Sequence, residues 1–201
     1  LKKDAENKAL KEAKEEAKKV VAALPNLTNE EKDVAKREID NATTTDAVTT
    51  AKNNAIAKDL EKEKEKAKKR IDQIKDNLKN PDDYKNQITA AKTKDDIAAI
   101  VRKAEDEAAK KQVEKNKAEA DTVRDEAKKK IDAIPGLTEA EKKHFKDLID
   151  GANTKGQIDK IVEDAKQYAD SKAKREAVKK EIENLPHLNK AQKADFIESI
   201  N

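Results

Sequence analysis

The chain has no cysteine, methionine or tryptophan, and its 201 residues include only two tyrosines and two phenylalanines. Without cysteine it has neither disulfides nor thiolate ligands for a metal ion. Aromatic residues make up 2% of the chain and hydrophobic residues 35%, a share that relies heavily on alanine. Such side chains are too few and too small to fill one large core, which excludes a single large globule and, with it, most enzymes.

Glycine and proline are also scarce, with three and four residues, while charged residues make up 44% of the chain. The 46 basic residues nearly cancel the 43 acidic ones, which favours long helices over disorder. Lysine and glutamate alternate at helical spacing, as in residues 61–70, where such pairs reinforce an exposed helix. Nucleic-acid binding is excluded because it needs clustered cations. Membrane insertion is excluded because no run approaches about 20 apolar residues.

The sequence repeats itself. A pattern of an apolar residue, proline, any residue, leucine and threonine or asparagine occurs three times, and a divergent copy also contains proline. The copies occupy residues 24–28, 78–82, 134–138 and 185–189. An isoleucine follows each copy, at Ile39, Ile88, Ile149 and Ile200. Their spacings of 49, 61 and 51 residues indicate a unit of about fifty residues with one longer spacer.

Each unit is predicted to contain three amphipathic helices, as the third copy shows most clearly. Its apolar residues recur at intervals of three and four, which places them on one face of a helix. The first helix carries Val123, Ala127, Ile131 and Ile134, the second Phe145, Leu148, Ile149 and Ala152, and the third Ile158, Ile161, Val162 and Ala165. Short polar joints separate these helices, so each unit is predicted to fold as a small three-helix bundle.

Helix start signals precede the second helix of every unit. Thr28, Thr138 and Asn189 each stand three residues before Glu or Gln, which is the pattern of a capping box. In the divergent copy Asn80 provides the N-cap, and Pro81 falls at the first helical position, where its missing N–H is harmless. The units are therefore predicted to share one architecture despite their different sequences.

The helices that link neighbouring units are predicted to be continuous. Residues 95–134 contain no glycine or proline, and their alanines and valines keep a helical rhythm throughout. Forty helical residues would span about 60 Å. Similar fusions are expected over residues 47–78 and 158–185. A strict coiled coil is disfavoured because proline interrupts the pattern too often. The expected fold is all-α, with tandem bundles joined by shared helices into an elongated, monomeric rod.

No constellation of residues supports catalysis, a metal site or a cofactor. His144 and His187 belong to different repeats, the three glycines lie at joints, and the apolar stripes contain no carboxylate. The aromatic residues are expected to pack rather than react. Phe145 and Phe196 occupy equivalent core positions, Tyr168 stacks on a linking helix, and Tyr84 covers a core while presenting its hydroxyl to solvent or a partner. The chain is therefore not expected to be an enzyme.

Residues 83–93, with the sequence Asp-Tyr-Lys-Asn-Gln-Ile-Thr-Ala-Ala-Lys-Thr, are followed by Ile97 and Ile100. This segment resembles the second and third helices of the GA module, the albumin-binding three-helix domain of Gram-positive surface proteins. The other copies resemble the GA-like repeats of giant extracellular-matrix-binding surface proteins of staphylococci. The resemblance implies the following organisation: a helix tail at 1–11, modules at 12–57, 61–108 and 120–170, a helical spacer at 109–119, and a truncated module at 174–201.

The resemblance also implies a function. It points to an extracellular, cell-wall-attached stalk and adhesin, whose signal peptide and anchor are expected outside this sequence. Serum albumin is the first expected ligand, and a matrix protein such as fibronectin the second. A spacer without any host ligand is the alternative, and an intracellular coiled-coil scaffold a more distant one. In the best-matching copy the implied contact face comprises Tyr84, Lys85, Asn86, Ile88, Lys92, Thr93 and Lys94.

Overall fold

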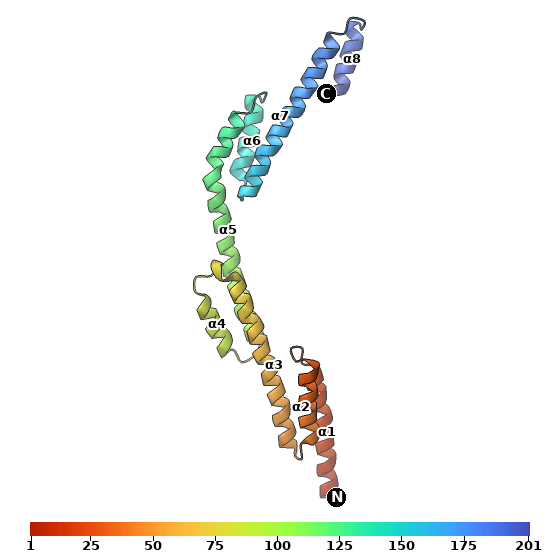
Figure 1. Ribbon diagram of the computed structural model, residues 1–201, viewed down its shortest axis with the longest axis vertical. Coiled ribbons are helices and arrows are strands. Elements are labelled where there is room, and N and C mark those ends of the chain that lie inside the picture. The colour runs from red at the N-terminus through yellow and green to blue at the C-terminus, as the bar shows by residue number, and fades with distance from the viewer. The chain divides into compact units, whose positions relative to one another are not determined.

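The structure, a computed structural model, describes all residues 1–201 and contains helices and no strand (Figure 1). The α-helices are α1 Lys2–Ala22, α2 Asn29–Asn41, α3 Thr45–Ile74, α4 Pro81–Ala90, α5 Lys94–Asp132, α6 Glu139–Gly151, α7 Lys155–Glu183 and α8 Lys190–Ile200, with a 3₁₀ turn, η1, at Lys75–Asn77. The all-α prediction is confirmed. The long helices α3, α5 and α7 cover most of the three stretches that were predicted to be continuous, and they end at Ile74, Asp132 and Glu183, two to four residues before the predicted ends.

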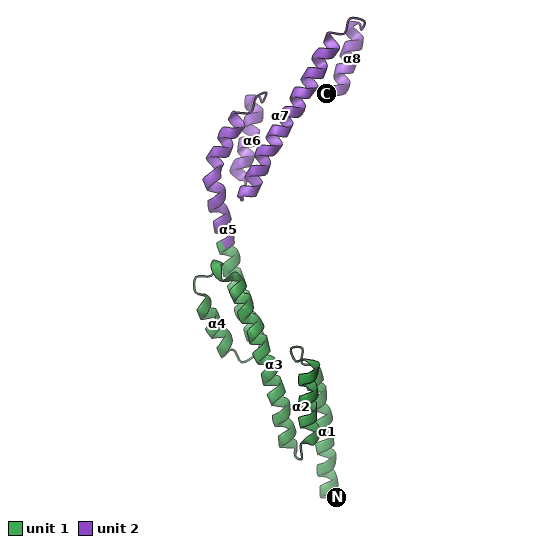
Figure 2. Cartoon of the chain, in the orientation of Figure 1, with its two compact units in different colours: residues 1–111 green, residues 112–201 purple.

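The chain forms two compact units, residues 1–111 and 112–201 (Figure 2). In the first unit, α1, α2 and the first half of α3 make a first bundle. The second half of α3, α4 and the first half of α5 make a second bundle. In the other unit, the rest of α5, α6 and the first half of α7 make a third bundle. The end of α7 then pairs with α8. This arrangement confirms the prediction of tandem three-helix bundles that share their long helices.

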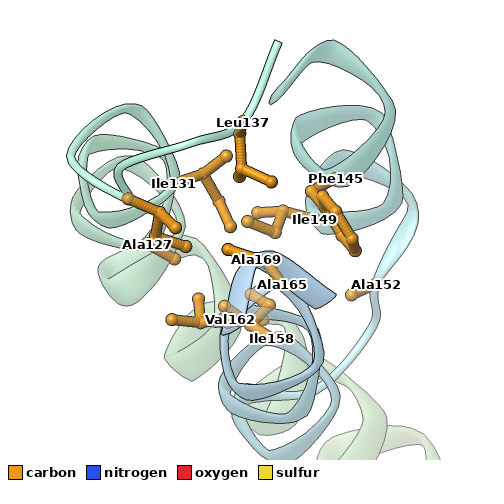
Figure 3. Packing of buried hydrophobic residues seen from close by; sticks show 12 residues of the cluster. Ala127, Ile131, Leu137, Phe145, Ile149, Ala152, Ile158, Val162, Ala165 and Ala169 are labelled. Carbon is orange, nitrogen blue, oxygen red and sulfur yellow. The ribbon is translucent and has the colours of Figure 1, made fainter. Parts of the chain in front are cut away.

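Each bundle has a thin core built from a few isoleucines, valines and leucines and from several alanines. In the third bundle, Ile131 of α5, Ile149 of α6 and Ile158 of α7 are fully buried and converge from the three helices (Figure 3). Ala127, Val162 and Ala165 fill the space between them, and their small size lets the helices approach closely. Three short apolar stripes of this kind are all that a bundle needs, which explains how an alanine-rich chain folds.

The predicted N-caps all form, but the capping box predicted at Thr138 makes only one of its two hydrogen bonds. Thr28 and Asn189 each make both hydrogen bonds of a capping box. Thr138 accepts a hydrogen bond from the backbone N–H of Glu141. Asn80 caps α4 by accepting from the N–H of Asp83, and Pro81 is the first residue of that helix. These side chains satisfy backbone donors that would otherwise remain unpaired at the helix N-termini.

The C-termini of the second helices are satisfied by a device that the sequence did not reveal. None of α2, α4 and α6 has a basic residue in its last turn. A basic side chain of the first helix instead reaches across and donates to their terminal carbonyls, where a positive charge is favourable. The pairs are Lys14 with Asp40 O at 2.7 Å, Lys64 with Thr89 O at 2.9 Å, and Arg124 with Ile149 O and, at 3.1 Å, Ala152 O.

Two side chains predicted to lie in cores are exposed. Leu148 precedes the buried Ile149 by one residue on α6, which turns it away from the core, and it is 45% exposed. Phe196 is 53% exposed, whereas the equivalent Phe145 is 9% exposed. The difference arises because a third helix covers Phe145, while α8 packs against α7 alone. Periodicity predicts which face of a helix is apolar, but burial also requires a neighbour.

Candidate functional site

The candidate contact face lies on α4, the joint that follows it and the start of α5. The side-chain hydroxyl of Thr93 caps α5 by accepting from the N–H of Asp96 at 3.1 Å. The joint itself is short because α4 ends at Ala90 and α5 begins at Lys94. The seven predicted residues are therefore brought into one region of the second bundle, but they play different roles there.

Tyr84 packs against the core of the second bundle and is only partly exposed. Burial, and then a hydrogen bond with the carboxylate of Glu107 on α5, raise the pKa of the Tyr84 hydroxyl above its ordinary value. Glu107 also accepts a hydrogen bond from the backbone N–H of Lys79 at 3.3 Å. The ring covers the core as predicted, but the hydroxyl binds Glu107 and so joins α4 to α5, whereas it was expected to face solvent or a partner.

Two of the predicted lysines are engaged within the protein. Lys85 pairs with Asp72 on α3, so its ammonium group is directed toward the first helix of its own bundle. Lys94 pairs with Asp59, also on α3, at a distance of 2.5 Å between Nζ and Oδ2. Both cations already have carboxylate partners, and a ligand would have to compete with those partners for them.

Ile88 is fully buried in the core of the second bundle. It supports the candidate face from beneath and does not reach its surface. Asn86, Lys92 and Thr93 are exposed. The accessible part of the face is therefore mainly polar, with the partly exposed Tyr84 as its apolar component, and it is suited to hydrogen bonding and to one cationic contact.

The capping glutamates of α2 and α6 bind lysines of the third helix of their bundle. Glu31 pairs with Lys58, at 2.7 Å between Nζ and Oε2, and with Lys62. Glu141 pairs with Lys172 at 2.8 Å. Hydrogen bonds from Lys58 first and Lys62 second hold the pKa of Glu31 well below its ordinary value. These ion pairs tie the start of the second helix to the third helix in both bundles.

Asp59 is a residue whose role was missed. The apolar stripes were expected to contain no carboxylate, yet Asp59 lies on the buried side of α3 and is 1% exposed. The repeat pattern held a signal for it. When the repeats are aligned on Ile39, Ile88 and Ile149, Asp59 stands where the later units have Ala108 and Ala169, both of which are buried. A charged residue at a core position of a repeat indicates a local function.

No group of three or more His, Asp or Glu side chains is arranged to hold a metal ion. The His144 ring lies edge-on to Phe145, with 5.5 Å between the ring centroids, and the Tyr168 ring lies tilted against Phe145, with 5.9 Å between the centroids. Tyr168 therefore packs on the linking helix as predicted, but with its ring tilted and not stacked. None of the helices combines the length and the apolar composition that crossing a membrane would require.

The comparison with solved structures gives a crystal structure of the 756–1003 domain of EbhA from Staphylococcus aureus. It shares 22% sequence identity with this chain, covers 79% of this chain and 71% of its own, and has a TM-score of 0.37. No curated protein sequence matches the chain. Four consecutive segments match the GA module, residues 7–59, 57–110, 110–171 and 171–201, which together span almost the whole sequence. These segments correspond to the three bundles and the final helical pair, and the chain therefore belongs to the GA module family.

Proposed function

We propose that the chain is a stalk segment of a bacterial cell-wall surface protein. In this proposal the tandem GA modules act as a spacer that keeps the distal parts of the protein away from the cell wall. One observation carries this proposal: α3 contributes Val48, Ala51 and Ala55 to the first core and Ala67 and Ile71 to the second, without a break. A helix that belongs to two cores replaces the flexible linker found between most domains.

The same arrangement recurs along the chain. Helix α5 has 39 residues, a length of about 58 Å. Its first half is buried in the second module and its second half in the third. Helix α7 continues from the third core into the pair with α8. Continuous helices resist bending far better than glycine-rich or serine-rich linkers do, and this resistance is what a stalk requires.

Small-angle X-ray scattering on the full chain tests the stalk. A compact protein of this length would have a radius of gyration of about 17 Å. We expect a clearly larger value and a distance distribution with a long tail, both independent of protein concentration, because the chain acts as a monomer. A radius of gyration close to that of a compact globule would refute the proposal.

A second candidate function is binding of a host protein by the second module, with serum albumin as the first ligand to test and fibronectin as the second. It is supported by the exposure of Asn86 and Lys92 and the partial exposure of Tyr84, all within the segment that most resembles albumin-binding modules. In this proposal Asn86, Lys92 and Thr93 contact the ligand directly. Tyr84 contributes its ring edge, Ile88 supports α4 from the core, and Lys85 and Lys94 contribute only if they leave their carboxylate partners.

Isothermal titration calorimetry of the full chain with albumin tests this second function. We expect binding that is weakened by the double substitution Asn86→Ala and Lys92→Ala. Arg37→Ala is the matched control, since Arg37 is exposed at the position of the first module that corresponds to Asn86. If neither albumin nor fibronectin releases heat, the stalk remains as the only function. If all variants bind the ligand equally well, its binding site lies in another module.

A further inference from the structure

The first two modules meet around a single buried carboxylate. Asp59 lies in the middle of α3 and within residues 57–59, which both module matches include. The loop between α1 and α2 approaches it from the first module, and the N-terminus of α5 approaches it from the second. The side chain is 1% exposed, so its charge is almost completely removed from water.

The loop of the first module binds Asp59 through Asn26. The backbone N–H of Asn26 donates to Oδ1 of Asp59 at 2.8 Å, and its side-chain amide donates to the backbone carbonyl of Asp59 at 3.3 Å. The same amide group donates to Glu63 at 2.6 Å and accepts from Lys66 at 2.5 Å. Asn26 therefore binds the loop to about two turns of α3, from Asp59 to Lys66.

The second module binds the other oxygen of the same carboxylate. Lys94, the first residue of α5, places its Nζ 2.5 Å from Oδ2 of Asp59. Each carboxylate oxygen thus serves a different module. A buried charge that loses a partner is left without compensation, which is strongly unfavourable. The burial of Asp59 therefore favours the state in which both contacts are formed.

The other repeats do not reproduce this arrangement. Ala108 and Ala169 stand at the positions that correspond to Asp59, and both are buried there. Lys155 is the counterpart of Lys94 in the third module, and it pairs with Asp159 of its own helix at 2.7 Å. The carboxylate is therefore not required for a GA module to fold. It is a feature added to one junction.

We propose that Asp59 clamps the first two modules into one rigid body, by binding the α1–α2 loop of the first module and the N-terminus of α5 in the second module at the same time. Without the clamp, only α3 itself and the polar contacts of Asn26 with Glu63 and Lys66 would connect the two modules, and thermal bending and twisting of the helix would vary the angle between them. The clamp fixes this angle. This inference holds whether or not the second module binds a host protein.

Pulsed electron–electron resonance between two spin labels tests the clamp in the full chain. The protein has no cysteine, so Arg37→Cys and Asn86→Cys introduce the only labelling sites, at equivalent exposed positions of α2 and α4. We expect a narrow distance distribution, which Asp59→Ala broadens and displaces. Glu65→Gln is the control, because Glu65 is an exposed carboxylate on the same helix. It should leave the distribution unchanged.

A second variant removes the contact that the second module makes with Asp59. The Lys94 side chain is 40% exposed, so Lys94→Gln removes the ion pair without opening the core. Lys92→Gln, two residues away and exposed, is its control. Helix content measured by circular dichroism shows whether each variant is folded, and Lys94→Gln decides the question if Asp59→Ala loses helix. Broadening by Lys94→Gln alone or by both variants supports the clamp. Distributions as narrow as in the unsubstituted protein, in folded variants, would overturn it, even if scattering still shows an extended stalk.

Discussion

Truncation of Ile149 to alanine probes how much one side chain contributes to a module with a thin core. Ile149 is fully buried in α6, at the centre of the third core, where it faces Ile131 and Ile158 from the two long helices (Figure 3). Replacing an isoleucine by alanine in a core costs about 2–5 kcal/mol, and the cost is highest where the surroundings cannot collapse into the cavity. The backbone of three helices surrounds this site, so we expect a loss of about 4 kcal/mol.

That loss is large in relation to the module. A domain of about 60 residues has a free energy of unfolding of roughly 3–9 kcal/mol. The substitution should therefore unfold the third module in a substantial fraction of molecules. Hydrogen exchange measured by mass spectrometry is the assay, because it reports each helix separately. We expect α6 and the adjoining halves of α5 and α7 to lose protection, while α1, α2 and α4 keep theirs.

The control for this experiment is the neighbouring residue. Leu148→Ala removes a similar volume from the same helix, but Leu148 is 45% exposed, so its effect should be a small fraction of that of Ile149→Ala. Equal effects of the two substitutions would refute the assignment of the core. Loss of protection over the whole chain would show that the modules do not unfold separately.

Three further predictions concern the polar contacts. Arg124→Ala should destabilise the third module by about 1–3 kcal/mol, because the α6 carbonyls lose a charged donor, and thermal unfolding with hydrogen exchange measures the loss. Glu31 has a pKa below its ordinary value of 4.5, so the stability that it contributes should be present above that pH and be lost as the pH falls below it. Melting temperatures from neutral to acid pH, compared with those of Glu31→Gln, measure this contribution. Tyr84 should ionise above pH 10, and Glu107→Gln should lower its pKa, as followed by phenolate absorbance in a Tyr168→Phe background.

Each of these predictions has an outcome that contradicts it. Arg124→Lys should keep part of the stabilisation, since the cation remains, and a variant as unstable as Arg124→Ala would show that packing matters more than charge. If the melting temperature of Glu31→Gln depends on pH in the same way as that of the unsubstituted protein, Glu31 does not cause the loss of stability in acid. If Glu107→Gln leaves the Tyr84 titration unchanged, burial alone raises the pKa.

The shared helices could be predicted because their cause is local. A stretch such as residues 95–134 has no helix breaker, and its apolar residues keep one rhythm, so the chain has no alternative to a continuous helix. The N-caps could be predicted for the same reason, since Thr28 and Glu31 interact within a single turn. In both cases the residues that decide the structure are neighbours in the sequence.

The junction could not be predicted in this way. A single aspartate on an alanine-rich helix is typical of a solvated face, and the burial of Asp59 depends on a loop 33 residues earlier and on the start of another helix. The candidate contact face shows the same limit. The resemblance of the segment around α4 to a GA module could be identified from its sequence. The pairing of Lys94 with Asp59 could not, because it depends on the short distance along α3 between the first two modules.

A helix that is part of two cores also makes neighbouring modules thermodynamically dependent. When the first module unfolds, the first half of α3 loses its packing, and fraying of that helix weakens the second module at its next turn. The stability of the array is then a sum of module terms and nearest-neighbour coupling terms, as in other repeat proteins. An inner module, supported from both sides, should open less often than a terminal one. Proteolysis and mechanical unfolding should therefore begin at the ends of the array and advance inward.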